Sequence, residues 1–585
     1  MSEKAGAANS SSIVFQDEEE VAIQRKYNFF TLLLTAALLV SACTRTSAST
    51  EATTGEPTAT YTEVKGEIQQ PAAPPSQTIT FTPTPQSTQA SSAFGPDLDD
   101  FPAGFNPLTG QLVGNPDLLK LPAILISITN FPPSARPQAG LSFAPMVFEI
   151  YISEGMTRFL VAFYGEEPKT KESITGDCAV REEPFEAADI VLSNLVWLDE
   201  NLNGVQDPDE PGVGGVCVTL YDTAGNTLQT TSTDSNGYYG FKVSAGDYVN
   251  GFDQTSSLAF TTPDFGFDDL DSDADPLTSL TPNFNVTATD MNWDVGLVET
   301  PPTPTPTGTY ESPTPEQPGG GGDGGGDVGG LSAVGPIRSM RWPYVYIRNF
   351  FTGSCLVSAS GDPTVLAHAP GCTYAYGSDE DDINSAFLDV TKMRQLAEAQ
   401  RAKNPGQALN YSGNVFSEQQ PPGSMNAQEL RVFYSFLNQT LWKFDLLSGA
   451  YMRYDDNTDG SGIFHPSTDR LTGRQLLFDN VIVLFAEHTA LAPTIIDINL
   501  QAGNFGSAYL FRDGQVYRIY WSTIGGEYEQ ATQLQRPIRF VDINGNPFPL
   551  KPGHTWINVM TTASYVTEED PGKWLARFLS PPGAK

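Results

Sequence analysis

The stretch RPQAGLSFAPMVFEIYISEGMTR, from Arg136 to Arg158, places a turn-rich start before apolar runs that are separated by a polar junction. The apolar runs, Phe143 to Tyr151 and Phe159 to Tyr164, have the length and residue content of buried strands. The junction, Glu149 to Met156, carries the polar residues between them. A second motif, GPIRSMR from Gly335 to Arg341, follows only after a segment of different composition, so we interpret that segment as an insertion.

Length and charge limit the classes of protein to which the chain can belong. Its 585 residues exceed what one hydrophobic core supports, so several folded units are expected. The formal net charge of −37 argues against a nucleic-acid partner, because phosphates require surfaces rich in lysine and arginine. The chain lacks a Walker A motif, and its glycine-rich tract is a linker, so no nucleotide partner is expected. The acidic balance favours cations and neutral or weakly acidic partners.

The N-terminus has the features of an export signal. Arg25 and Lys26 precede the apolar run Phe29 to Val40, which is short for a membrane span but suits a signal peptide. The run ends in VSAC, so residues 1–43 resemble a bacterial lipoprotein signal in which Cys43 becomes the lipidated N-terminus; the alternative is an ordinary signal peptide. Residues 44–100, rich in Ser, Thr and Pro, predict an unfolded tether. We therefore expect an outward-facing protein anchored to the cell membrane through its lipid.

Four cysteines follow Cys43, an even number that fits disulfide bonds in an oxidising compartment. None lies in a C-x-x-C pair, so a zinc site is not expected. Four cysteines allow three pairings. Because each pair would lie within one segment, we expect Cys178 to bond with Cys217 and Cys355 with Cys372.

Outside the insertion, the chain predicts strands and one clear helix. Leu121 to Thr129 has the apolar content of a buried strand, and Thr391 to Lys403 has helical spacing of its apolar residues. From Leu430 onward, apolar and aromatic residues alternate with polar ones between Gly, Asp and Asn turns, which predicts a strand-rich region.

Several of these motifs together resemble the signature of the YerB-like lipoproteins, an exported bacterial family whose activity is not established. They are NPLTG at Asn106 to Gly110, the RPQAG and EGMTRF motifs, GPIRSMR, and, further on, Leu471-Thr472-Gly473 and Lys551-Pro552-Gly553. The resemblance implies an N-terminal domain split into residues 101–176 and 331–425, a C-terminal domain at 426–565 and a tail at 566–585. We therefore expect a multidomain α/β plus all-β protein: a mixed α/β body with a strand-rich C-terminal domain, interrupted by an inserted β-sandwich.

The insertion contains a calcium-loop pattern. In DENLNGVQDPDE, oxygen-bearing side chains occupy positions 1, 3, 5, 9 and 12, a glycine occupies position 6, and position 7 can offer its carbonyl. The predicted calcium ligands are Asp199, Asn201, Asn203, Val205, Asp207 and Glu210. The flanking sequence predicts strands rather than a pair of helices. The alternative to a calcium site is an acidic loop that is only solvated.

This segment, residues 183–298, resembles the calcium-loaded B-type repeat of serine-aspartate adhesins, a relative of the collagen-adhesin B sandwich. Further acidic sets, Asp234 with Asn236 and the run Asp268 to Asp275, could form additional sites. Lys242 lies outside the first strand, where the adhesin-type isopeptide lysine would sit, so no internal isopeptide bond is expected. Residues 299–330, rich in Pro and then Gly, predict a linker.

The body shows no catalytic motif of the well-marked hydrolase, zinc or nucleotide classes. We expect its signature motifs to form a cleft that captures an anionic group, because arginine forks suit carboxylates and phosphates. The predicted ligand-binding residues are Arg136, Glu149, Glu154, Arg158, Arg338, Arg341 and, in the strand-rich half, His488. Structural ion pairs and a hydrogen-bonded core histidine are the alternatives.

Two functions follow from this set. The first is a non-enzymatic envelope lipoprotein that binds a cell-wall polymer or an envelope protein, with the calcium module as a spacer or adhesive insert. The second is an envelope hydrolase acting on wall glycan or peptide, with Glu149 or Glu154 as acid or base. The lack of a recognisable nucleophile or metal set favours the first.

If Cys43 is lipidated, cells fed an alkyne fatty acid should incorporate the label into the wild-type protein, because the diacylglyceryl group is attached to the cysteine sulfur. The Cys43→Ala variant should carry no label. Label that persists in this variant would contradict the prediction.

Overall fold

A computed structural model describes residues 93–584, except 171–174, 177, 179, 182, 209, 254–257, 265–269, 300–331, 370–372 and 376–385. The predicted signal, Cys43, most of the predicted tether and most of the predicted linker therefore lie outside the described residues. The protein is strand-rich, with 41% strand and 11% helix. The all-β part of the predicted fold class is supported, whereas a mixed α/β body is not, because helices contribute little to the body.

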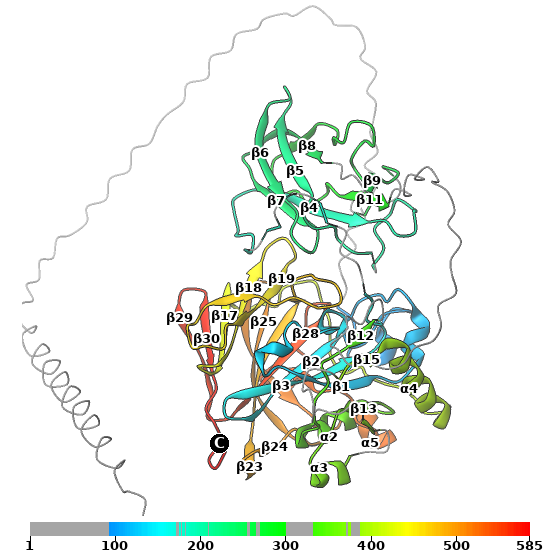
Figure 1. The fold of residues 1–585 in the computed structure, drawn as a ribbon, viewed down its shortest axis with the longest axis vertical. Helices are drawn as coiled ribbons and strands as arrows, with labels where there is room; N and C mark the ends of the chain where they lie inside the picture. Colours follow the sequence, from blue (N-terminus) through cyan, green and yellow to red (C-terminus); the bar gives the residue numbers. More distant parts are fainter. Residues whose placement is uncertain are drawn as a thin grey trace, which may run out of the picture. The chain divides into compact units, whose positions relative to one another are not determined.

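The largest sheet of the body has eleven strands. Its order is β14-β13-β1-β3-β2-β28-β22-β25-β26-β16, with β27 paired to β26. The strands are β1 (Ile124–Thr129), β2 (Met146–Ser153), β3 (Met156–Phe163), β13 (Cys355–Ser358), β14 (Thr373–Ala375), β16 (Met425–Asn426), β22 (Asn480–Ala486), β25 (Phe505–Arg512), β26 (Gln515–Ser522), β27 (Arg539–Val541) and β28 (Thr555–Thr561). Figure 1 shows β1, β2, β3 and β28 side by side.

A tight hairpin turn organises the centre of this sheet. Glu154 and Gly155, between β2 and β3, both have positive φ, at 53° and 76°. Two such residues form the primed turn whose twist matches that of paired strands. A side chain at Gly155 would also meet Ser435, because an added Cβ would lie 2.3 Å from its Cβ. The turn therefore fixes the register of β2 and β3 at the middle of the body.

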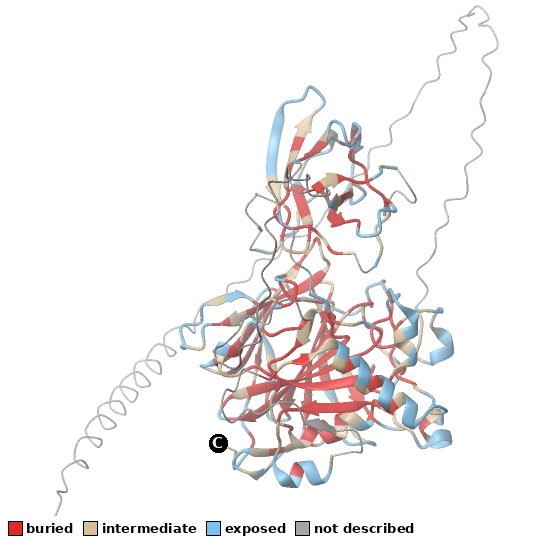
Figure 2. Ribbon diagram, turned by 45° about the vertical axis from the view of Figure 1, so that its right-hand side comes forward, coloured by how far each residue is buried: buried red, intermediate tan, exposed pale blue. Residues whose placement is uncertain are grey.

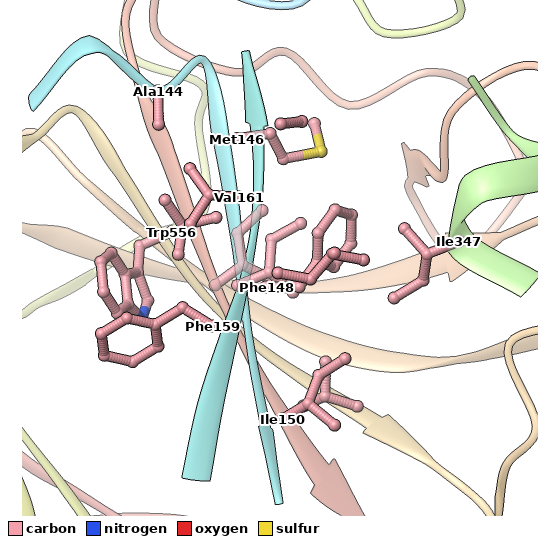
Figure 3. Packing of buried hydrophobic residues seen from close by; sticks show 14 of the residues in the cluster. Ala144, Met146, Phe148, Ile150, Phe159, Val161, Ile347 and Trp556 are labelled. Atoms are coloured by element: carbon pink, nitrogen blue, oxygen red, sulfur yellow. The ribbon is translucent and has the colours of Figure 1, made fainter. Parts of the chain in front are cut away.

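Strands from both halves of the chain share this sheet. β2 pairs in parallel with β28, and Val147 lies opposite Trp556 in the register. One continuous hydrophobic core includes residues from both predicted body domains. Figure 2 shows buried residues along the strands throughout the body, and Figure 3 shows Phe159 and Trp556 packed together within this core. The body is therefore not divided into separate N- and C-terminal cores.

A second sheet packs against the first. Its order is β20-β19-β18-β17-β30-β29, with β21 paired to β19. The rings of Trp442 and Trp556 lie 5.4 Å apart between the two sheets. The strands are β17 (Glu429–Ser435), β18 (Asn438–Asp445), β19 (Ala450–Asp456), β20 (Phe464–Pro466), β21 (Leu477–Phe478), β29 (Tyr565–Asp570) and β30 (Lys573–Arg577). The predicted tail thus supplies two strands. They were not predicted because charged residues are typical of exposed edge strands as well as of loops.

The remaining elements of the body are short. The 3-10 helices are Leu98–Asp100, Pro116–Lys120, Pro133–Ala135 and Leu141–Phe143, and the small strand pairs are β12 (Ala333–Val334) with β15 (Leu388–Asp389) and β23 (His488–Ala492) with β24 (Ile495–Ile498). The α-helices are α2 (Trp342–Asn349), α3 (Pro363–Ala367), α4 (Val390–Lys403) and α5 (Glu527–Thr532). α4 confirms the predicted helix, and the Asp389 side chain caps its first turn. None of the described helices is both long and apolar enough to cross a membrane.

The insertion forms a β-sandwich with a core of its own. Its two sheets have the orders β10-β8-β5-β6 and β7-β4-β11-β9. A disulfide joins Cys178 to Cys217, the pair that we expected; Cys355 is also disulfide-bonded, while Cys372 lies outside the described residues. The strands are β4 (Val191–Leu198), β5 (Cys217–Asp222), β6 (Thr227–Ser232), β7 (Tyr238–Lys242), β8 (Gly246–Phe252), β9 (Leu258–Phe260), β10 (Phe284–Val286) and β11 (Val295–Glu299).

The two separated motifs meet in the folded body. Ala139 of RPQAG and Gly335 of GPIRSMR exchange backbone hydrogen bonds of 2.8 and 3.2 Å. The chain also leaves and re-enters the body at neighbouring points, because the Thr170 amide donates a 2.8 Å hydrogen bond to the Ser332 hydroxyl. The two junctions of the insertion are therefore adjacent on the body, at a surface position where insertions are usually tolerated.

Deleting residues 171–331 and joining Thr170 to Ser332 through a short Gly/Ser turn should leave the body folded. The sandwich core shares no residue with the body core, and the two junction residues are already hydrogen-bonded. Thermal unfolding should show the transition of the body within a few degrees of that in the full chain. A control deletion that also removes β3 should abolish cooperative unfolding; loss of folding in the first deletion would contradict the prediction.

Candidate functional site

The predicted arginine and glutamate cleft does not form, because strand alternation separates its members. Glu149 lies opposite Phe159 in the β2–β3 register, whereas Arg158 lies opposite Ile150. Adjacent residues of a strand point to opposite faces of the sheet. Glu149 and Arg158 are therefore on opposite faces, and the prediction that the listed arginines and glutamates line one cleft is wrong.

Glu149 lies in a sealed polar site between the two sheets. Its side chain is fully buried and accepts hydrogen bonds from the Thr157 hydroxyl at 2.7 Å and from the Trp556 indole at 3.1 Å. Burial raises the pKa of Glu149, although Arg453 and the two hydrogen bonds oppose the shift. The carboxyl group is satisfied from within the protein and has no surface through which to meet a macromolecule.

Arg453, in β19, is the central cation of this site. Its guanidinium lies 4.7 Å from the Trp556 ring centroid and 5.5 Å from that of Phe159. It donates hydrogen bonds to Asp455 at 2.6 Å and to Ser467 at 3.0 Å. Stacking on aromatic rings and forked hydrogen bonding are the two capacities of arginine that lysine lacks. Arg453 therefore connects the eleven-stranded sheet to the seven-stranded sheet.

Arg136, the first residue of RPQAG, belongs to the same buried network. It donates to the Asp456 carbonyl at 3.2 Å and to the Asn130 side chain at 3.1 Å. It also lies 3.8 Å from an Asp455 carboxylate oxygen and 3.5 Å from one of Asp456. Burial opposes ionisation of Asp455, but Arg136 and Arg453 hold the pKa of that carboxyl below its ordinary value. Arg136 is thus matched by buried carboxylates, as in a structural ion pair.

The other three arginines lie with GPIRSMR. Arg158 donates two hydrogen bonds of 2.8 Å to Ser339, one to its carbonyl and one to its hydroxyl. The Arg338 amide donates to the Ser127 carbonyl at 2.8 Å, which aligns the motif with β1. Arg341 is the residue before the first turn of α2. Arg158 therefore binds the second motif to the first, and we now expect its loss to act on stability.

Glu154 and His488 do not join Glu149. Five residues along an extended strand cover about 16 Å, so Glu154 in the hairpin turn is far from Glu149. This exceeds the 5 to 10 Å, roughly, that separates the paired carboxylates of glycosidases. His488 is buried in β23, and burial lowers its pKa to about 4 despite a 2.9 Å contact between Nδ1 and the Ala486 carbonyl. It is a neutral core histidine, which was the alternative interpretation.

Buried residues of the second half of the chain, which the sequence reasoning missed, hold the segment that begins with RPQAG. Asp469 is fully buried and accepts hydrogen bonds from the Gly140 and Ser142 amides at 3.0 and 2.8 Å. Gly140 needs its left-handed φ of 95°, and a Cβ there would lie 2.9 Å from Val334. Arg453, Asp455 and Asp469 lie in the other half of the chain. The only signal for their role in the sequence is that they are charged residues within or next to predicted strands.

The second candidate site is the loop before β5 in the sandwich. The side-chain amides of Asn201 and Asn203 both donate to one Asp207 oxygen, at 2.6 and 2.8 Å. The Asp199 carboxylate is buried and accepts from the Asn203 amide at 3.1 Å, and also from the Thr261 hydroxyl. Glu210 folds back and accepts from the Glu200 and Asp207 amides at 2.9 and 3.1 Å. The loop therefore brings its predicted ligands together.

This donor set fits calcium. All the donors are oxygens once an asparagine presents its carbonyl, and calcium prefers oxygen ligands. Burial raises the pKa of Glu210, and the nearby charge of Asp199 adds to the shift, so a cation would relieve the repulsion. No group of three or more His, Cys, Asp or Glu side chains in the described part of the chain is arranged to hold a metal. This includes Asp199, Asp207 and Glu210, whose carboxylates hydrogen-bond within the loop instead.

The further acidic sets have different roles where they are described. Arg181 donates to Asp234 at 2.6 Å, and the amides of Asn236 and Tyr238 donate to the same carboxylate. This carboxylate is therefore already bound. Asp275 accepts from the Leu277 and Thr278 amides, which closes a turn. Asp271 bridges to Val205 of the calcium-loop segment, while Asp268 and Asp269 lie outside the described residues.

Comparison with known families agrees with this architecture. Residues 108–182 match the N-terminal domain of a protein family of unknown function, DUF3048, and residues 430–557 match its C-terminal domain. Residues 190–297 match the SdrD B-like domain. The chain therefore combines both domains of the YerB-like DUF3048 family with an SdrD B-like domain between them. The crystal structure of YerB from Bacillus subtilis is similar with a TM-score of 0.40 and 17% identity, covering 78% of this chain and 96% of that one.

Curated relatives share short stretches with this chain. A fibrinogen-binding protein of Staphylococcus epidermidis is 48% identical over 85 residues, which are 14% of this chain and 8% of that protein. Serine-aspartate repeat-containing protein I of Staphylococcus saprophyticus is 47% identical over 79 residues, 13% of this chain and 4% of that protein. Serine-aspartate repeat-containing protein D of Staphylococcus aureus (strain Newman) is 35% identical over 132 residues, 22% and 9% respectively. The matches therefore span less than a tenth of each of these relatives.

Replacing Arg453 with alanine should lower the free energy of unfolding by about 3 to 5 kcal/mol, because it leaves buried carboxylates without their cation. Arg431→Ala is the matched control: Arg431 lies in β17 of the same sheet, is only partly buried and bonds to Gln439. Its loss should cost no more than about 1 kcal/mol. Urea unfolding measures both values, and equal losses would contradict the central role of Arg453.

Proposed function

We propose that this chain is an exported envelope protein, anchored through lipidated Cys43, that binds a partner or ligand at the cell surface. Its SdrD B-like domain is a calcium-stabilised surface module. The likeness of this module to domains of a fibrinogen-binding protein and of serine-aspartate repeat proteins supports an envelope or extracellular location. The matches cover 8% and 4% of those two proteins, so the binding that the first one's name describes is not assigned to this chain.

The observation that carries the calcium assignment is the closed loop around Asp207. Asn201, Asn203 and Asp207 lie within hydrogen-bond distance of one another, and Glu210 crosses back over the loop. In the proposed site, Asp199, Asn201, Asn203, Asp207 and Glu210 supply side-chain oxygens and Val205 supplies its carbonyl. Calcium would hold the loop in one conformation and neutralise part of the acidic surface. A stiff module of this kind suits a spacer or an adhesive insert.

A hydrolytic role for Glu149 and Glu154 is not supported by their positions. Glu149 is fully buried between two sheets, and Glu154 lies in a hairpin turn at the end of the strand. A general acid or base must reach the substrate, directly or through one water. The arrangement therefore favours binding over hydrolysis by this pair.

Calcium should raise the melting temperature of the sandwich without moving that of the body. Extracellular calcium modules bind with dissociation constants of about 0.1 to 1 mM, so about 10 mM calcium should stabilise the folded sandwich by about 1.4 to 2.7 kcal/mol. Differential scanning calorimetry of the full chain, in calcium and in chelator, measures both transitions.

The Glu210→Ala variant should lose most of this shift. Asp247→Asn is the matched control, because Asp247 is an exposed carboxylate in β8 of the same sandwich, bonded to Asn285 outside the loop. A calcium shift that is absent from the wild type, or unchanged in Glu210→Ala, would refute the proposed site.

A further inference from the structure

The body has an open groove on its eleven-stranded sheet that none of the signature motifs lines. Its volume is about 640 Å³, within the range of ligand sites, which is roughly 300 to 1,000 Å³. The floor is formed by the ends of β22, β25 and β26. The turn between β28 and β29 and the first residues of β29 form one wall. The groove therefore lies where the seven-stranded sheet ends at its edge strand.

Aromatic side chains occupy the exposed part of the floor. The rings of Phe505 and Tyr520 stack with centroids 5.1 Å apart and planes within 10°. Tyr509, also on β25, has Arg518 packed over its ring at 5.6 Å. Tyr565 adds a ring from the wall. Phe505 and Tyr565 are 52% and 47% exposed. Exposing several rings side by side costs free energy in water, so such patches usually mark binding surfaces.

Strand register explains why these rings share one face. Ser507 lies opposite Tyr520, and Tyr509 lies opposite Arg518, in the β25–β26 pair. Side chains two residues apart on a strand point to the same side, so Phe505 and Tyr509 join Tyr520 and Arg518 there. Further along the same face, Phe511 is buried against Tyr451 of the seven-stranded sheet, with centroids 6.4 Å apart. On this face of the sheet, β25 therefore contributes buried core residues at one end and groove residues at the other.

The rest of the lining combines apolar and polar residues and carries no net charge. Asn499, Asn504, Ser507 and Thr562 provide amide and hydroxyl groups, and Glu487 and Arg518 are the charged residues of the lining. A phosphate-rich or strongly acidic ligand would require a surplus of cations. In a chain with a net charge of −37, this balanced groove is suited to a neutral ligand.

We propose that this groove binds a β-linked, N-acetylated glycan. Pyranose rings present flat faces of C–H groups that pack on the electron-rich faces of aromatic rings, while their hydroxyl and acetamido groups bond to amides and hydroxyls. A β-1,4-linked chain is extended and flat, which matches ring positions laid out along paired strands. The inference deepens the proposed surface-binding function by naming a ligand class, but the binding itself does not depend on calcium or lipidation.

The test uses the exported chain without its signal peptide, in chelator, titrated with a hexamer of β-1,4-linked N-acetylglucosamine. Isothermal titration with the hexamer up to about 10 mM detects millimolar affinity. Phe505→Ala and Tyr520→Ala should each weaken binding by about tenfold, because each removes one stacking surface. Phe436→Ala is the matched control, since Phe436 is 68% exposed but lies outside the groove, between β17 and β18. It should bind like the wild type.

Each outcome decides the proposal. Absence of binding in the wild type, or binding that Phe505→Ala and Tyr520→Ala leave unchanged, overturns it. Capture of a synthetic peptide of residues 301–318 instead of the hexamer also overturns it, and would assign the groove to a proline-rich segment of this chain. Because the titration is done in chelator, its failure is distinct from failure of the calcium site.

Discussion

The stacking of the Arg453 guanidinium on Trp556 is the contact on which the body most depends. Arg453 belongs to the seven-stranded sheet, and Trp556 belongs to the eleven-stranded sheet. The same indole donates to Glu149, and the same guanidinium bonds to Asp455, which lies near Arg136. A buried cation needs both a partner charge and satisfied hydrogen-bond donors. These requirements join segments from both halves of the chain around one point.

This network gives the paired motifs a physical meaning. Residues of RPQAG, EGMTR and GPIRSMR contact one another or the network: Ala139 pairs with Gly335, Arg158 bonds to Ser339, and Thr157 bonds to Glu149. These residues hold the segments of the body together in its interior and do not form a ligand-binding surface. The exposed aromatic rings that could meet a ligand lie elsewhere, on β25, β26 and β29.

The sequence predicted local features well and long-range ones poorly. β1, β2, β3 and α4 follow from apolar periodicity, turn residues and spacing, all of which act within about a dozen residues. The predicted arginine cleft does not form. Glu149 and Arg158 lie an odd number of residues apart on two paired strands, so their side chains point to opposite faces of the sheet. The sequence does not reveal this pairing. Arg453 and Asp455 were missed because partners such as Phe159 and Arg136 lie in the other half of the chain. The strands of the tail were missed because charged residues on an edge resemble those of a loop.

The junction at Thr170 and Ser332 has a mechanical consequence. Both residues lie at one point of the body, one hydrogen bond apart. Besides these junctions, the sandwich also contacts the body, since the Gln475 amide donates to the Ser235 hydroxyl at 3.1 Å. A pulling force on the sandwich would load these contacts together with the short segments next to β3 and β12. A surface module attached in this way could bear tension while the body beneath it keeps its fold.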